Sequence, residues 1–193
     1  MKLSEKKVLK KKEEIILSAI KIVNRKGYQA ATMEEIAAEL LMTKGSLYYY
    51  FKNKEDLIFQ CHEIVLSKVM EELQTHLEEP VSYEERLKKM IMTHIHYAIE
   101  EKETFNLIIK PNETFSEKLN PILEKRQAYA SYFDQVIQRG IEAKQFTVTE
   151  PKIVRMILLG AMNWIQQWYS SDGIMTKEQI QSIYADYLIK LVK

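Results

Sequence analysis

Apolar residues recur three and four positions apart along most of this chain, the spacing that gathers them on one side of an α-helix. In the first part of the chain the pattern predicts helices over 12–26, 33–40 and 53–78, and a very short one over 44–51. Later stripes predict four more, over 82–102, 120–144, 149–169 and 176–191. No strand-like alternation of apolar and polar residues is sustained, and the chain has only five Gly and four Pro. We therefore expect an all-α protein.

Polar residues mark where several of these helices begin. Three starts have capping-box spacing, in which two side chains three residues apart each satisfy a free backbone N–H: Thr32 with Glu35, Ser82 with Glu85, and Thr176 with Gln179. Asn120 and Pro121 suit the cap and first position of another helix, and Gly27 suits a helix end. Residues 1–10 are rich in Lys, so we expect a mobile arm there, with continuation of the first helix by one turn as the alternative. Residues 104–121 are expected to form a short apolar segment and a broken connector.

The stretch from Thr32 to Lys54 places two helices close together. The first ends near Leu40, and a break of two residues leads to Thr43, which can cap the short helix that follows. That helix directs its N-terminus and a row of Tyr side chains outward, while Leu47 and Phe51 are expected in the core. With the helix over 12–26 packed behind, the arrangement predicts a three-helix helix-turn-helix head whose short helix enters a DNA major groove.

Charge is distributed unevenly along the 193 residues. Residues 1–54 hold 12 Lys and Arg against 6 Glu, a net charge of +6, and the remainder holds 16 against 21 acidic residues, a net charge of −5. A basic head on an acidic body is typical of a nucleic-acid-binding domain joined to a regulatory domain. Taken alone, the basic charge also fits a solvated Lys-rich arm. We predict a DNA-binding domain over 1–54 and a larger helical ligand-binding and dimerisation domain over 55–193.

Several functional classes find no support in the residues. No Ser-His-Asp or Cys-His set, Gly-rich phosphate loop or metal-ligand spacing occurs, and His94 and His96 fall on nearly opposite sides of a helix. We therefore expect no enzyme, no cofactor and no metal site. The single Cys, Cys61, cannot form an internal disulfide, and no apolar run approaches the ~18 residues of a membrane span. A cytoplasmic protein without membrane contact is expected.

The run G-Y-x-A-A-T-M-E-E-I-A through K-G-S-L-Y-Y-Y-F-K-N-K-E-D-L, from Gly27 to Leu57, resembles the DNA-binding head of the tetracycline-repressor (TetR) family. The resemblance implies a repressor that binds double-stranded operator DNA. It implies that Thr32 and Thr43 contact phosphates through their hydroxyls, and that Lys44, Gly45 and Ser46 reach base edges from the start of the short helix. It also implies that Tyr48 and Tyr49 contact thymine methyls or the backbone, and that Tyr50 and Lys54 bind phosphate. A surface aromatic patch or packing face is the alternative interpretation of the Tyr run.

One position departs from the family's pattern. Where related heads usually have Gly between the two helices, this chain has Leu41. A non-Gly residue held at positive φ costs about 1 to 2 kcal/mol, so we expect the turn to be strained or slightly different in shape.

The run G-A-M-N-W-I-Q-Q-W-Y-S-S-D-G-I-M-T-K-E-Q-I, residues 160–180, is similar to the C-terminal helices of a TetR branch that contains regulators of fatty-acid and acyl-CoA degradation. The resemblance implies a small hydrophobic or acyl-CoA effector. The candidate residues that would line the site are Met90, His94, Tyr129, Phe133, Asn163 and Trp164. Arg126 and Arg155 are the candidate cations for the CoA phosphates. A bulky drug-like effector is the rival, and simple core packing is the third interpretation.

The helix predicted over 149–169 is apolar on nearly every side, and such a helix must be covered all round in a soluble protein. We expect it to pair with the last helix in a two-fold homodimer, whose four-helix interface spaces two heads for a palindromic operator. A helical interaction module without DNA binding is the alternative, and Lys44, Tyr48, Tyr49 and Lys54 argue against it.

Overall fold

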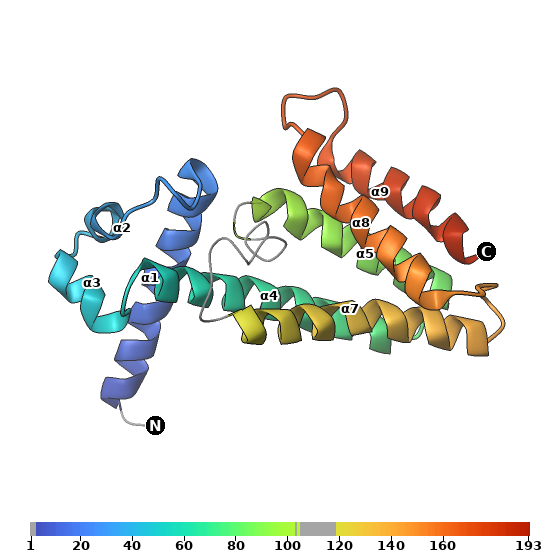
Figure 1. Cartoon of the computed structure of the whole chain (residues 1–193), viewed down its shortest axis with the longest axis horizontal. Helices are drawn as coiled ribbons and strands as arrows, with labels where there is room; N and C mark the ends of the chain where they lie inside the picture. The colour runs from blue at the N-terminus through green and yellow to red at the C-terminus, as the bar shows by residue number, and fades with distance from the viewer. Residues whose placement is uncertain (1–2, 103, 105–118) are drawn as a thin grey trace. The chain divides into compact units, whose positions relative to one another are not determined.

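The computed structural model describes residues 3–102, 104 and 119–193 (Figure 1). Within these residues every regular element is a helix, so the expected all-α fold is confirmed. The described chain forms two compact units. The first comprises the residues up to Leu66 with Thr104 and Leu119, and the second comprises 67–102 and 120–193. The division predicted between residues 54 and 55 stays a prediction.

Three helices and the start of a fourth build the first unit. They are α1 (Leu3–Lys26), α2 (Met33–Glu39), α3 (Lys44–Tyr50) and the part of α4 (Lys54–Glu78) that precedes Ser67. Their apolar sides are buried together, and α2 packs against both α1 and α3. The buried side chains include Ile15, Ile16, Ala19, Val23, Ile36, Ala37, Leu47, Phe51, Leu57 and Ile58. The predicted three-helix arrangement is therefore present.

Short polar side chains fix where these helices begin. Each cap oxygen accepts a backbone N–H three residues on: Thr32 from Glu35 at 3.1 Å, Thr43 from Ser46 at 3.1 Å, and Asn53 from Asp56 at 2.7 Å. Of the predicted capping boxes, the one between Thr176 and Gln179 has both halves. The carboxylate of Glu35 instead binds Nζ of Lys26 at 2.6 Å, which ties α2 to the end of α1.

The N-terminal part of α1 differs from the prediction. Residues 3–10 are helical, so the expectation of a mobile arm is wrong for them. Lys and Glu are good helix formers, and Lys11 pairs with Glu14 at 3.1 Å across one turn. α7 (Leu119–Glu142) already includes Asn120, which is therefore not the predicted cap of that helix. Of the apolar segment and connector predicted over 104–121, residues 105–118 lie outside the described residues, and residues 119–121 belong to α7.

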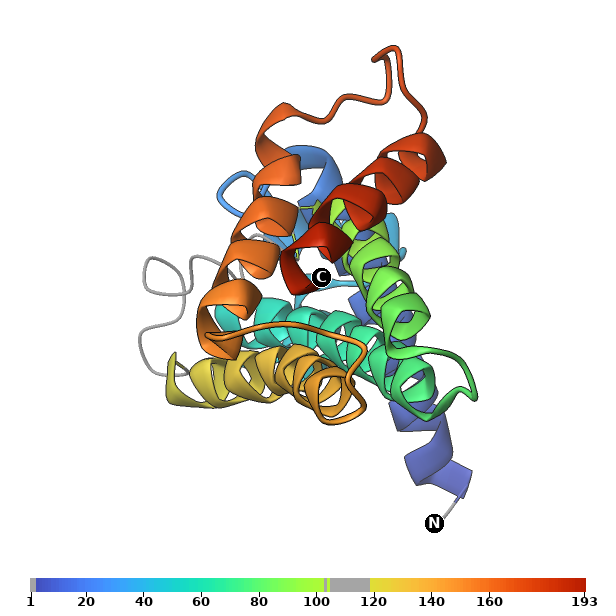
Figure 2. The ribbon, with the colours of Figure 1, turned by 90° about the vertical axis from the view of Figure 1, so that its right-hand side faces the viewer.

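The second unit holds the rest of α4 with α5 (Tyr83–Glu100), α7, α8 (Pro151–Trp168), α9 (Lys177–Leu188) and the short 3-10 helix η2 (Ile189–Val192). α5 packs along both α8 and α9, as the end-on view shows (Figure 2). Its buried side chains include Leu87, Met90, Ile91, His94, Ile95 and Ala98. The centre of this unit is therefore the buried side of α5.

Candidate functional site

The turn between α2 and α3 holds Leu41 in the left-handed region of backbone space. Its φ is 54°, and its side chain is 97% exposed, so no packing offsets the conformation. The N–H of Leu41 donates to the carbonyl of Ala38 at 3.0 Å, and that of Met42 to the carbonyl of Ala37 at 2.8 Å, which ends α2 sharply. The expected strain is therefore present at this position, on the order of 1 to 2 kcal/mol.

α3, the recognition helix of seven residues, separates a buried side from an exposed side. Leu47 and the cap residue Phe51 are buried, as predicted, whereas Tyr48 is 42% and Tyr49 75% exposed. Tyr50 is half-buried and meets Tyr49 edge to face, with ring centroids 5.0 Å apart. The rings of Tyr48 and Tyr49 are therefore exposed, and that of Tyr50 is half-buried.

The first turn of α3 exposes a cation and an open stretch of backbone. Lys44 forms an ion pair with Glu34 of α2, and its Nζ lies 5.8 Å from the centroid of the Tyr48 ring. The hydrogen bond between the two charged groups raises the pKa of Lys44 and lowers that of Glu34. A Cβ added at Gly45 would meet no atom within 4 Å. The fold itself therefore does not require glycine there, and the backbone is open to close approach.

Lys54, at the start of α4, is held against the loop that follows α1. Its Nζ donates to the carbonyl of Gln29 at 3.2 Å and lies 4.3 Å from the centroid of the Tyr28 ring. Partial burial lowers the pKa of Lys54. An ammonium group has three donors, so this position still has N–H groups to offer a phosphate.

The remaining DNA-contact candidates are hydroxyl residues at helix starts. Thr32 and Thr43 use their oxygens as caps, and Oγ of Ser46 lies 2.8 Å from Oγ1 of Thr43. A hydroxyl that accepts a hydrogen bond still has its own proton to donate, so capping and phosphate contact are compatible. We call Thr32, Thr43, Lys44, Gly45, Ser46, Tyr48, Tyr49, Tyr50 and Lys54 the recognition surface; their contacts with DNA stay predictions.

A buried polar cluster joins three helices of the second unit. Nδ1 of His94 on α5 lies 2.7 Å from the hydroxyl of Tyr129 on α7, and its Nε2 lies 3.1 Å from Oδ1 of Asn163 on α8. The Phe133 ring packs beside them, with its centroid 6.3 Å from that of His94 and 5.9 Å from that of Tyr129. Met90 is buried one turn before His94 on α5. Five of the predicted ligand residues therefore belong to one region.

Burial sets the charge state of this cluster. It lowers the pKa of His94 to about 4 and raises the pKa of Tyr129, so both side chains are neutral at pH 7. Oδ1 of Asn163 can only accept, so Nε2 of His94 carries the proton and donates it. Nδ1 then accepts from the Tyr129 hydroxyl. The cluster is a neutral, directional chain of hydrogen bonds.

Gln166, which the sequence prediction missed, adds an unpaired amide to α8. Its side chain is 2% exposed, and neither amide atom has a hydrogen-bond partner within the described residues. It lies on the same side of α8 as Asn163, three residues away, and on the buried stripe that includes Met162. An unpaired buried amide costs about 1 to 3 kcal/mol, so a bound molecule that satisfied it would gain accordingly.

Three predicted ligand residues lie outside this cluster or are already engaged. Trp164 is 65% exposed on the outer side of α8, because neighbouring residues on a helix point in different directions. Nε of Arg155 donates to Oδ1 of Asp134 at 2.7 Å. Arg126 is half-buried, its pKa is lowered by burial, and it has no hydrogen bond or ion pair within the described residues.

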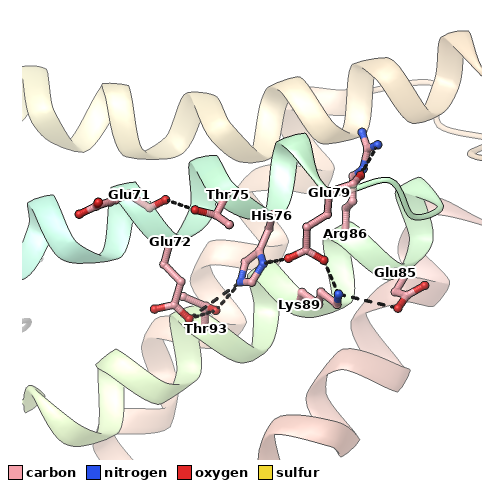
Figure 3. Close-up of polar contacts among 9 residues, drawn as sticks. All are labelled: Glu71, Glu72, Thr75, His76, Glu79, Glu85, Arg86, Lys89 and Thr93. Carbon is pink, nitrogen blue, oxygen red and sulfur yellow. Dashed lines mark hydrogen bonds and ion pairs between the residues drawn. The ribbon is translucent and has the colours of Figure 1, made fainter.

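A second polar network ties the later part of α4 to α5 (Figure 3). Nδ1 of His76 lies 2.9 Å from Oε1 of Glu79, and its Nε2 lies 2.9 Å from Oγ1 of Thr93 on α5. Thr93 donates to Oε1 of Glu72 at 2.9 Å, and Lys89 pairs with Glu79. The sequence prediction missed this network, although the acidic residues stand one helical turn on either side of His76.

The outward sides of α8 and α9 are rich in apolar residues. Of the seventeen large apolar side chains exposed among the described residues, ten fall between Ile153 and Leu191. Trp168 stacks on Tyr184 with ring centroids 6.2 Å apart, which links the two helices. We call this surface the apolar face: Ile153, Met156, Ile157, Trp164, Trp168, Ile183, Tyr187 and Leu191.

Two kinds of site are missing from the described part of the chain. It holds no group of three or more His, Cys, Asp or Glu side chains able to bind a metal ion, and none of its helices is long and apolar enough to cross a membrane. What it does hold is a capped helix-turn-helix with an exposed recognition helix, followed by a helical body. That architecture defines a DNA-binding transcriptional regulator.

Comparison with known proteins gives the family. The model of bacterial regulatory proteins of the tetR family matches residues 15–61, and the model of the tetracyclin repressor-like C-terminal domain matches residues 80–192. The chain therefore belongs to the TetR family, as both sequence runs predicted, and it is a transcriptional regulator and not an enzyme.

Individual relatives are similar over most of the chain. The fatty acid metabolism regulator protein of Bacillus subtilis is 23% identical over 168 residues, 82% of this chain and 84% of that protein. The solved fatty acid degradation regulator FadR of Bacillus halodurans is 22% identical with a TM-score of 0.76, over 93% of this chain and 94% of its own. AibR in complex with isovaleryl coenzyme A and operator DNA is 23% identical with a TM-score of 0.78, over 94% and 97%. These two structures share the fold of this chain.

Proposed function

We propose that this chain is a repressor that binds a palindromic operator as a homodimer and is released by a small effector. The observation that carries the proposal is the division of α3: Leu47 and Phe51 are buried in the head, which leaves Tyr48 and Tyr49 exposed on the other side. A helical interaction module would have no use for such an exposed, capped helix. A protein that binds operator DNA acts in the bacterial cytoplasm, so the proposal includes that location.

The recognition surface divides into groups that read bases and groups that hold the backbone. Lys44, Gly45 and Ser46 open the recognition helix, the part that reaches base edges in helix-turn-helix proteins. Lys44 exchanges Glu34 for DNA at little cost, because both partners of this ion pair are exposed. Lys54 and the capping hydroxyls contact phosphates, which fixes the register of the head on the duplex without reading sequence.

The apolar face supports the homodimer. It lies on α8, α9 and η2, the part of the chain predicted to pair. Trp164 and Tyr187 are the kind of large aromatic residues that anchor protein interfaces. Two copies related by a two-fold axis would cover the face with itself. Sedimentation at micromolar concentration should give about twice the 22.8 kDa chain mass. The Trp164→Glu variant should sediment closer to the mass of a monomer. Leu123→Glu, at an exposed site on α7, should leave the mass at that of the dimer.

We propose that the effector binds at the His94 cluster and is an acyl-CoA. Met90 and Phe133 supply apolar surface for an acyl chain, and the buried amide of Gln166 can donate to a thioester or amide carbonyl. Arg126 has no described partner and can meet a CoA phosphate, whereas the charge of Arg155 is already paired with the carboxylate of Asp134. The B. subtilis fatty acid metabolism regulator and the isovaleryl-CoA complex of AibR support this class of effector.

Release of the operator requires that the effector bind more tightly to the arrangement of the two heads that does not fit DNA. α4 supplies a physical link, because it runs without interruption from its cap at Asn53 to Glu78. The His76 network attaches its later part to α5, the helix that carries His94. A shift of α5 on binding would therefore act on a helix that continues into the head.

Titration of a DNA complex with acyl-CoA of increasing chain length tests the effector. Release should strengthen with chain length, and Arg126→Gln should weaken it more than Arg155→Gln because only Arg155 already has a carboxylate partner. The second candidate is a bulky drug-like compound, which would use Tyr129 and Phe133 without either Arg. Release by free hydrophobic compounds alone, with no effect of CoA esters, would contradict the acyl-CoA proposal and favour this second candidate.

A further inference from the structure

The first ten residues of α1, Leu3–Lys12, form a basic helix that extends beyond the core of the head. We call this segment the basic arm; it carries five Lys and one Glu. None of the side chains from Glu5 to Glu14 is buried, and the first buried side chain of α1 is that of Ile15. Packing therefore does not account for the composition of these turns.

Three of the five Lys residues of the arm gather on one side of the helix. Lys6, Lys7 and Lys10 are separated by three and four positions, which makes them neighbours on the helix surface. They have no hydrogen bond or ion pair within the described residues, while Lys11 pairs with Glu14 at 3.1 Å. The buried stripe of α1 begins on the opposite side, at Ile15 and Ile16. The arm therefore exposes three Lys side chains that have no ion-pair partner within the described residues.

The C-terminal end of the arm, at Lys12, lies beside the recognition helix. Nζ of Lys12 lies 5.4 Å from the centroid of the Phe51 ring, and Phe51 is the residue that caps the C-terminal end of α3. From that contact α1 continues past α3 toward the N-terminus (Figure 1). Ten residues at ~1.5 Å rise span about 15 Å, which matches roughly four base pairs along one strand.

We propose that the basic arm is a second DNA-binding element, which binds the sugar-phosphate backbone next to the half-site entered by the recognition helix. This inference rests on the proposed function and adds a contact outside the helix-turn-helix. Lys side chains meet phosphates as point charges and carry no base preference, so the arm contributes affinity and salt dependence and not sequence selection. A helical arm also loses less conformational freedom on binding than a disordered tail of the same charge.

The chemistry of the arm favours nucleic acid over a lipid surface. Helices that lie in membrane interfaces combine basic residues with a wide apolar side that includes aromatic residues. Between residues 5 and 12 the apolar side chains are only Val8 and Leu9, and no aromatic residue is present. Contact with Phe51 next to the recognition helix places the arm where a bound duplex would pass.

The test uses the full-length protein and a random-sequence duplex of about 40 base pairs. The double variant Lys6→Gln and Lys10→Gln removes two charges from exposed helical positions, and Lys68→Gln with Lys102→Gln removes two exposed charges from the second unit as the matched control. Affinity is measured at several salt concentrations. Each lost phosphate contact lowers the slope of log affinity against log salt by about 0.9, so the arm variant should lose about two units and the control none.

Hydroxyl-radical footprinting on a site selected in vitro gives an independent readout. The wild-type footprint should protect backbone that the arm variant leaves open at the outer edge of each half-site, with unchanged base preference. If the wild type binds DNA and the arm variant has the same salt slope and the same footprint, the basic arm does not bind DNA, and the proposed function still stands. No DNA binding by the wild type would overturn both, and altered base preference would contradict the assignment to the backbone.

Discussion

The recognition surface of the head and the His94 cluster of the body differ in what their polar groups contact. On the head, Tyr48 and Tyr49 are exposed and Lys44 is held only by an exposed ion pair, so these groups can exchange their partners for DNA. In the body, His94 and Tyr129 are buried and bonded to each other. Substitutions in the first region should therefore change binding with little change in stability, whereas those in the second should change stability first.

The largest expected effect is the pH dependence caused by His94. Its pKa is about 4 in the folded chain and 6.5 is its ordinary value, so the unfolded chain binds the proton more readily. The stability tied to this group is therefore fully present above pH 6.5 and is lost as the pH falls toward 4. The free energy of unfolding should fall by about 3 kcal/mol over that interval through this group.

Urea unfolding at fixed protein concentration measures this effect between pH 7 and pH 4.5. His94→Gln removes the titrating group, so its unfolding free energy should depend less on pH than that of the wild type. Equal pH dependence in both proteins would show that His94 is not held neutral by burial. Burial would then not explain the difference between the recognition surface and the His94 cluster.

The second effect concerns the turn of the helix-turn-helix. Leu41→Gly should raise the free energy of unfolding of the head by about 1 kcal/mol, because glycine adopts a φ of 54° without strain. Leu123→Gly, at an exposed position inside α7, should lower stability by about the same amount. The denaturation midpoints of the two variants should move in opposite directions; a drop for Leu41→Gly would contradict the strain assigned to this turn.

The smallest effect on stability is expected at Gly45. Gly45→Ala adds a methyl group into open space and a better helix former, so stability should rise by at most about 1 kcal/mol. DNA affinity should nevertheless fall, by roughly tenfold or about 1.4 kcal/mol, if the backbone of α3 approaches the duplex closely. Fluorescence anisotropy with a labelled duplex measures the affinity. Unchanged binding would mean that DNA does not come close to this part of α3.

The head could be predicted from the sequence because its geometry is local. Thr43 and Ser46 form their cap across three residues, and Leu41 stands between two helices that are neighbours in the chain. Turn chemistry and spacing therefore carry most of the information. The full helical start of α1 was not predicted beyond one possible extra turn, because its low apolar content hides the high helix propensity of Lys and Glu.

The sites of the body could not be predicted from the sequence in the same way, because they are assembled from distant segments. His94, Tyr129 and Asn163 meet only through the packing of three helices, and periodicity gives no register between helices. α8 is apolar on nearly all sides, so the sequence could not distinguish the inward Gln166 from the outward Trp164. The partner of Arg155 is a carboxylate 21 positions away on another helix, which no spacing rule identifies.

Selection of binding sites from a random duplex pool, followed by affinity and salt titrations, tests most directly whether the recognition surface binds DNA. Lys54→Ala should weaken binding to all sequences and reduce the salt slope by about one unit, because it removes one phosphate contact. Lys44→Ala and Tyr48→Ala should also change the selected bases, because these side chains lie on the recognition helix. Unchanged affinity in all three variants would contradict DNA binding through this head.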